Sequence, residues 1–152
     1  MNHILRTEIA LPLPRPKVFE FFADATNLER ITPPEMRFVI TSPQPITIKQ
    51  GALIDYSLSL FGVPFGWRTL IAEWQPNDYF VDKQLRGPYA LWEHRHSFFD
   101  APDGGTINRD EVTYRLPLSP LGDVAYPLVR AQLGRIFAYR QQAVREILLG
   151  KA

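Results

Sequence analysis

The chain has 152 residues, of which 45% are hydrophobic and 22% are charged, and this suits one soluble domain with a substantial core. Its net charge of +1 gives no strong field for nucleic acid or an acidic membrane, and the absence of cysteine excludes disulfides and thiolate chemistry. No stretch resembles a signal peptide or a membrane span. We therefore expect one cytoplasmic domain over 1–152, with no nucleic-acid partner and no stable membrane insertion.

The first part of the chain predicts a strand and then short helices. Side chains that alternate in polarity indicate a strand over His3–Leu11. Pro16 suits the first turn of a short helix with an apolar face, and a further turn or two follows until Pro33 ends it. A second strand is expected over about Arg37–Ser42.

Longer strands follow, separated by short turns rich in glycine and proline. Their predicted ranges are Ala52–Phe61, Phe65–Trp74, Tyr79–Arg86, Tyr89–Asp100 and Thr106–Leu116. Because the connections are short, neighbouring strands should pair antiparallel. The strand Phe65–Trp74 is apolar on both faces, with Leu70, Ala72 and Trp74 on the second one, which leaves room for an interface on the outside of a sheet.

The last part of the chain changes to a helical period. Apolar residues recur at helical spacing from about Ala125 to Leu149, Asp123 suits the N-cap, and Gly150 ends the helix. The order of elements predicts an α+β fold. In it, a curved antiparallel sheet of about seven strands wraps around the long C-terminal helix, with two short helices after the first strand.

Several motifs carry a resemblance that covers essentially the full chain. They are Phe80-x-Asp82-x-Gln84, Gly87-Pro88-Tyr89, Trp92-x-His94-x-His96-x-Phe98, Asp110-x-Val112-x-Tyr114-x-Leu116-Pro117 and Phe137-x-Tyr139-Arg140. These motifs and the order of elements resemble a bacterial ligand-binding subfamily of the START-like, or polyketide cyclase/dehydrase (SRPBCC), superfamily, which has the helix-grip fold. The resemblance implies a deep, largely apolar cavity between sheet and helix, and it implies no defined reaction and no cofactor.

The strand Tyr89–Asp100 carries the clearest candidate site. Side chains alternate along a strand, so Trp92, His94, His96 and Phe98 share one face. Two of the three histidines of the chain therefore lie beside two aromatic rings. This face predicts the lining of a cavity or an unusually polar part of the core.

Asp110 is expected to face the two histidines, because a tight hairpin joins its strand to theirs. Its apolar neighbours would bury it, and a buried carboxylate needs a partner such as a histidine or Arg140. One interpretation makes His94, His96 and Asp110 an acid–base group that enolises or dehydrates a carbonyl compound. The alternative, which we favour, is a buried ion pair that orients the cavity walls.

A metal site would need a third ligand beside His94 and His96. Zinc sites have at least three protein ligands, and only Asp82 or Asp110 could complete this one. We therefore expect no bound metal.

Aromatic residues supply the remaining candidates for ligand binding. The candidate lining residues are Tyr56, Trp67, Trp92, His94, His96, Phe98, Asp110, Tyr114 and Phe137. The rings should surround a space on the usual scale of ligand cavities, about 300–1,000 Å³.

Three classes of function follow from these observations. The first, which we favour, is binding or transport of a small apolar or amphipathic ligand that is lipid-, polyketide- or aromatic-like. The second is a cyclase or dehydratase that uses His94, His96 and Asp110. The third is a protein-interaction module, which could be a homodimer.

Overall fold

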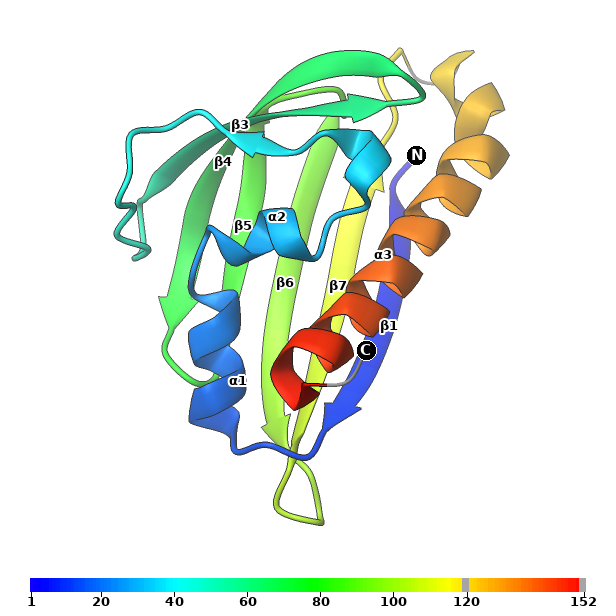
Figure 1. Ribbon diagram of the computed structural model, residues 1–152. Helices are drawn as coiled ribbons and strands as arrows, with labels where there is room; N and C mark the ends of the chain where they lie inside the picture. The colour runs from blue at the N-terminus through cyan, green and yellow to red at the C-terminus, as the bar shows by residue number, and fades with distance from the viewer. Residues whose placement is uncertain (119–120, 151–152) are drawn as a thin grey trace.

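A computed structural model describes residues 1–118 and 121–150, and its main element is a curved antiparallel sheet (Figure 1). Among these residues the sheet has seven strands in the order β1-β7-β6-β5-β4-β3-β2. The strands are β1 (His3–Leu11), β2 (Val39–Ile40), β3 (Leu53–Leu60), β4 (Val63–Gln75), β5 (Tyr79–Arg86), β6 (Leu91–Asp100) and β7 (Thr106–Arg115). The α+β prediction and the antiparallel pairing are confirmed.

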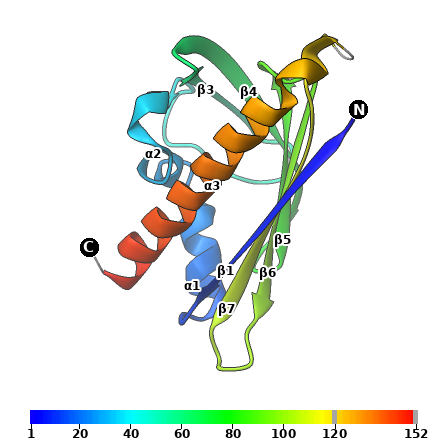
Figure 2. The same ribbon diagram turned by 90° about the vertical axis from the view of Figure 1, so that its right-hand side faces the viewer.

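Helices cover one face of this sheet. They are α1 (Arg15–Phe22), α2 (Asn27–Arg30), the 3-10 turns η1 (Pro34–Met36) and η2 (Leu121–Ala125), and the 24-residue α3 (Tyr126–Leu149). Figure 2 shows that α3 runs obliquely across the sheet and that α1 and α2 lie on the same side of β5–β7. None of the described helices has the length and hydropathy needed to cross a membrane.

Three local predictions need correction. The strand expected over Arg37–Ser42 shrinks to β2, because Arg37 has a left-handed backbone (φ 50°) at the end of η1. Asp123 does not cap α3, since η2 leads directly into the helix and the N-cap position falls on Ala125. Tyr89 precedes β6 because the side chain of Gln84 bonds both its N–H and its carbonyl oxygen and holds it in a turn.

β4 bends the sheet and also reduces the outer apolar face that the sequence predicted. Its pairing with β5 shifts register between Arg68 and Thr69 and again between Ile71 and Glu73, and such bulges increase local twist. The second shift turns Trp74 inward, where its ring lies 5.1 Å from that of Phe19. The expected interface on the outside of this strand therefore loses its largest apolar residue.

The interior between sheet and helices has two large apolar parts and a smaller one around Ala25, Ile54 and Ile71. We call one the packed half, which α1 covers: Ile9, Leu11, Val18, Phe19, Phe22, Phe80, Phe98 and Val144. We call the other the hollow half, which lies beside the curved end of the sheet formed by β3 and β4. Its residues are Met36, Leu58, Trp67, Tyr89, Trp92, Tyr114, Leu133 and Phe137. The candidate site lies where the two meet.

Candidate functional site

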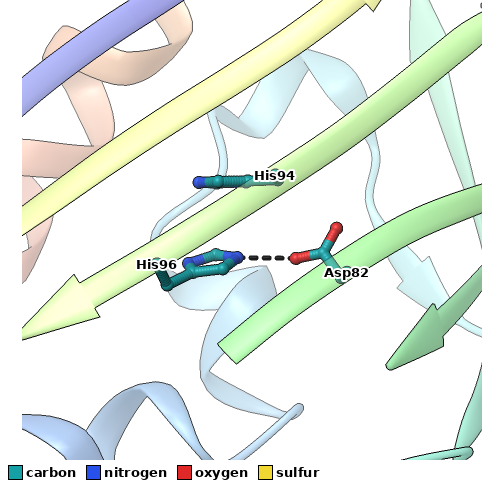
Figure 3. Close-up of side chains that lie close together, drawn as sticks. All are labelled: Asp82, His94 and His96. Carbon is teal, nitrogen blue, oxygen red and sulfur yellow. Dashed lines mark hydrogen bonds and ion pairs between the residues drawn. The ribbon is translucent and has the colours of Figure 1, made fainter. Parts of the chain in front are cut away.

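Five polar side chains meet inside the fold, and we call them the polar cluster: Asp82, His94, His96, Asp110 and Arg140. The strand register explains the meeting, because Asp82 on β5 pairs with His94 on β6, and His96 pairs with Asp110 on β7. Arg140 reaches the cluster from α3. Figure 3 shows the two imidazole rings lying one above the other, with Asp82 beside His96.

Short contacts connect every member of the cluster. His94 Nε2 lies 2.8 Å from Asp110 Oδ1, and His96 Nε2 lies 2.6 Å from Asp82 Oδ2. The other nitrogen of His96, Nδ1, lies 3.4 Å from Asp110 Oδ1. Arg140 Nη2 is 3.7 Å from the same oxygen, and the two imidazole rings stack with 3.6 Å between their centroids. Asp110 is therefore the common partner of His94, His96 and Arg140.

The two histidines differ in charge although they are adjacent. Burial, together with the charge of His96, lowers the pKa of His94 to about 4, so His94 is neutral at neutral pH. Burial also acts to lower the pKa of His96, but hydrogen bonds to Asp110 and Asp82 outweigh it and raise that pKa above the ordinary value. His96 is thus the histidine that carries the proton.

Both carboxylates are held in the charged form. Burial raises the pKa of Asp110, but Arg140 and the hydrogen bonds from both histidines bring that pKa well below its usual range. Burial opposes ionisation of Asp82 too, and the hydrogen bond from His96 more than compensates, so the pKa of Asp82 is lowered. Two negative and two positive charges therefore balance within the cluster.

If His96 is protonated, its contact with Arg140 is a close approach of two cations and not a hydrogen bond. Arg140 Nη2 lies 3.4 Å from His96 Nδ1, a distance that would allow a hydrogen bond to an unprotonated nitrogen. A protonated His96 donates from both nitrogens and accepts from neither. Asp110, which faces both cations, holds them together.

A cavity of about 150 Å³ opens beside the cluster in the hollow half. Its walls are largely apolar and include Tyr56, Leu58, Trp67, Trp92, Leu133 and Phe137. Asp82, His94, His96 and Arg140 also line it, whereas Asp110 does not. The cavity is smaller than the range expected from the sequence, because large aromatic side chains fill much of the space under β3 and β4.

The structure separates the predicted lining residues into two groups. Those that line the cavity are Tyr56, Trp67, Trp92, His94, His96 and Phe137. Phe98 lies one step further along β6 and packs in the other half, 5.1 Å from the ring of Phe19. Tyr114 is buried against Tyr89 and His3, and Asp110 lies behind the histidine rings.

Other lining residues were not in the predicted site. The sequence suggested Asp82 only as a metal ligand, although Asp82 shares a face of β5 with Phe80, and this alternation is a usable signal. Met36 and Leu133 reach the cavity from η1 and α3, and nothing in their local sequence marks them as lining residues. Their position depends on how these elements cross the sheet.

Trp67 carries an unusual polar atom. Its indole nitrogen is buried and has no hydrogen-bond partner among the described residues. The rings of Trp67 and Trp92 are nearly perpendicular, with 5.4 Å between centroids, and both residues line the cavity.

Asp82, His94 and His96 also form a group that could hold a metal, since one ligand atom of each lies within 4.8 Å of the others. The fit is poor for two reasons. Asp82 and His96 already bond each other through Oδ2 and Nε2, and Arg140 brings a positive charge to the same cluster. The expectation of no bound metal stays a prediction.

Comparison with known proteins shows the fold. No protein-family model and no curated protein matches the chain. The Zhui aromatase/cyclase from Streptomyces sp. R1128 is similar in structure with a TM-score of 0.76 and 16% identity, over 97% of this chain and 96% of that one. A protein from Thermus thermophilus, TTHA0849, gives a TM-score of 0.72 and 17% identity, over 99% of both chains.

A third similar structure is that of a START superfamily protein. It comes from Mycobacterium smegmatis, with a TM-score of 0.70 and 12% identity, over 95% of this chain and 99% of that one. These likenesses agree with the seven-stranded sheet and the long C-terminal helix seen in the described residues. The chain has the START-like helix-grip fold.

Proposed function

We propose that the protein binds a small apolar or amphipathic ligand in the cavity between the sheet and α3. The observation that carries this proposal is an apolar cavity with charged and polar side chains gathered at one end. Ligand sites commonly combine apolar walls with a few placed polar groups. The apolar walls would bind the body of the ligand, and the polar cluster would orient it.

Intrinsic fluorescence offers a direct test, because Trp67 and Trp92 both line the cavity. A small apolar probe that does not absorb in the same range, such as cyclohexanol, should change tryptophan emission in a saturable way. The Leu58→Phe variant, which places a larger side chain in the cavity wall, should lose this response. A linear response, or one that Leu58→Phe leaves unchanged, would contradict binding at this site.

A second candidate is an enzyme of the cyclase or dehydratase type. It is favoured by one geometric feature: neutral His94 donates from Nε2 to Asp110, which leaves Nδ1 with a free lone pair that could take a proton from a substrate. One of the similar structures is that of an aromatase/cyclase. The low pKa of His94 makes it a weak base, so we place binding first.

Proton exchange separates the two candidates. A catalytic His94 should accelerate exchange of the acidic carbon-bound protons of acetylacetone for deuterium, measured by NMR, and His94→Gln should abolish the acceleration. For a binding protein we expect no acceleration over buffer in either variant.

A further inference from the structure

We propose that the ligand is a neutral molecule with a single ring that carries a hydroxyl group, for which a phenol is the simplest example. This rests on the binding function proposed above and adds the chemistry of the ligand. It depends on three properties of the site: which polar atoms face an incoming molecule, the balance of charge, and the size of the cavity.

The polar end of the cavity offers hydrogen-bond acceptors. Asp82 uses Oδ2 for His96, and its Oδ1 has no hydrogen bond among the described residues. Asp82 is also the most accessible acid of the cluster, with 17% of its side chain exposed against 4% for Asp110. His94 donates from Nε2 to Asp110, so Nδ1 of the neutral ring is an acceptor without a partner in this part of the chain.

The donors of His96 are already engaged. His96 directs Nε2 to Asp82 and Nδ1 to Asp110, and Arg140 contacts the same Asp110 through Nη2 at 3.7 Å. A ligand therefore meets Asp82 Oδ1 and His94 Nδ1 with their lone pairs unused. A hydroxyl group supplies the donor that these atoms lack, whereas a hydrocarbon leaves them unsatisfied when it displaces water.

The balance of charge disfavours an anionic ligand. Asp82 and Asp110 are offset by His96 and Arg140, so a bound carboxylate would add a third negative charge and give the cluster a net negative charge. Burial of an uncompensated charge is strongly unfavourable. This argues against fatty acids and benzoates as ligands.

Size and shape point to one ring. The volume of about 150 Å³ is close to that of cavities that hold benzene. The walls include the aromatic residues Tyr56, Trp67 and Trp92. A planar single-ring molecule fits such a space, and its hydroxyl group would point toward Asp82.

Three probes of nearly equal size test the proposal: p-cresol, p-xylene and benzoate, titrated into the wild-type protein at neutral pH by calorimetry. We expect p-cresol to bind about ten-fold or more tightly than p-xylene, since a hydrogen bond to a charged group is worth at least that factor. Benzoate should bind the weakest. Equal affinity for p-cresol and p-xylene, or tighter binding of benzoate, would overturn the inference while leaving apolar binding intact. If none of the three binds, the proposed function itself fails.

A matched pair of variants locates the effect. Asp82→Asn removes the negative charge beside the cavity, so the preference for p-cresol over p-xylene should fall and benzoate should gain affinity. Asp55→Asn removes a charge of the same type on the outer face, where Asp55 pairs with Arg68, and should change neither value. If a folded Asp82→Asn protein kept the wild-type preference for p-cresol and the wild-type affinity for benzoate, Asp82 would not be the residue that selects the ligand. If that variant does not fold, the three wild-type affinities still decide.

Discussion

The two halves of the interior are built from similar residues and are filled differently. In the packed half, α1 inserts Phe19 and Phe22 against Phe98, with ring centroids 5.1 Å and 5.7 Å apart. In the hollow half, Tyr56, Trp67 and Trp92 stand around a cavity. Aromatic content alone therefore does not decide whether an interior binds a ligand. What differs is how far the helix side chains fill the space: Phe19 of α1 packs directly on Phe98, whereas Leu133 and Phe137 of α3 leave a cavity above the sheet.

The polar cluster lies between the halves and belongs to both. The ring of His96 stacks on Phe80 of the packed half at 4.1 Å, and its other face meets His94 at 3.6 Å. His94 in turn meets Trp92 and Phe137 of the hollow half. One side of the cluster is thus supported by close packing, and the other side borders the cavity.

Removal of charge from Asp110 should have the largest effect on this arrangement. Asp110→Asn leaves two cations with one carboxylate, and a broken buried pair of this kind costs about 3–5 kcal/mol in free energy of unfolding. Denaturant titration measures the loss. Affinity for p-xylene should change little in the folded fraction, because Asp110 does not line the cavity.

The neighbouring residue provides the control. Glu111 pairs with Arg6 on the exposed face, so Glu111→Gln should cost no more than about 1 kcal/mol. An Asp110→Asn protein that is as stable as Glu111→Gln would show that the cluster is not a structural ion pair. If it also lost a measurable activity, the enzymatic interpretation would be preferred.

Larger side chains should have the next largest effect, and the effect should differ between the packed half and the hollow half. Val144 is only 1% exposed in the packed half, and overpacking of a filled core costs about 1–3 kcal/mol, so Val144→Phe should be destabilised by that amount. Leu58→Phe can extend into the cavity and should stay close to wild-type stability while it loses ligand binding. Thermal and denaturant unfolding compare the pair. Equal destabilisation would mean that the hollow half has no usable space.

Acid should weaken the protein through His94. The pKa of His94 is about 4 in the folded chain and 6.5 in the unfolded one. Between these values the unfolded chain binds more protons, so the free energy of unfolding decreases as the pH is lowered. At pH 5 the loss is on the order of 2 kcal/mol. His96, with a raised pKa, contributes fully below 6.5 and loses its contribution only as pH rises.

The two carboxylates do not disturb this window. The pKa values of Asp82 and Asp110 are lowered by folding, so their contribution is complete above the unfolded value and is lost only in stronger acid. A His94→Gln protein, which can still donate to Asp110, should show a flatter stability curve between pH 6.5 and 4. An unchanged slope would contradict the neutral state of His94.

The sequence predicted the sheet, the long helix and the face of β6 because each depends on local periodicity. It also placed Asp110 opposite the histidines, since one hairpin sets that register. Phe98 and Tyr114 were predicted to line the cavity with the rest of their strand faces. Alternation cannot tell that α1 will cover Phe98, or that Tyr89 and His3 will bury Tyr114. The inward orientation of the Trp74 side chain depends on a β-bulge, and no single residue in the sequence predicts that bulge.

Metal removal should have the smallest effect of all. Asp82 Oδ2 and His96 Nε2 already bond each other at 2.6 Å, and Arg140 is a cation in the same cluster, so a divalent ion would have to break one contact and meet repulsion from another. Purified protein should therefore contain no stoichiometric zinc by elemental analysis, and a chelator should leave the melting temperature unchanged. One zinc per chain, lost together with stability in Asp82→Asn, would instead make Asp82, His94 and His96 a metal centre. The boundary between the packed and hollow halves would then be held by coordination in place of the buried ion pairs described above.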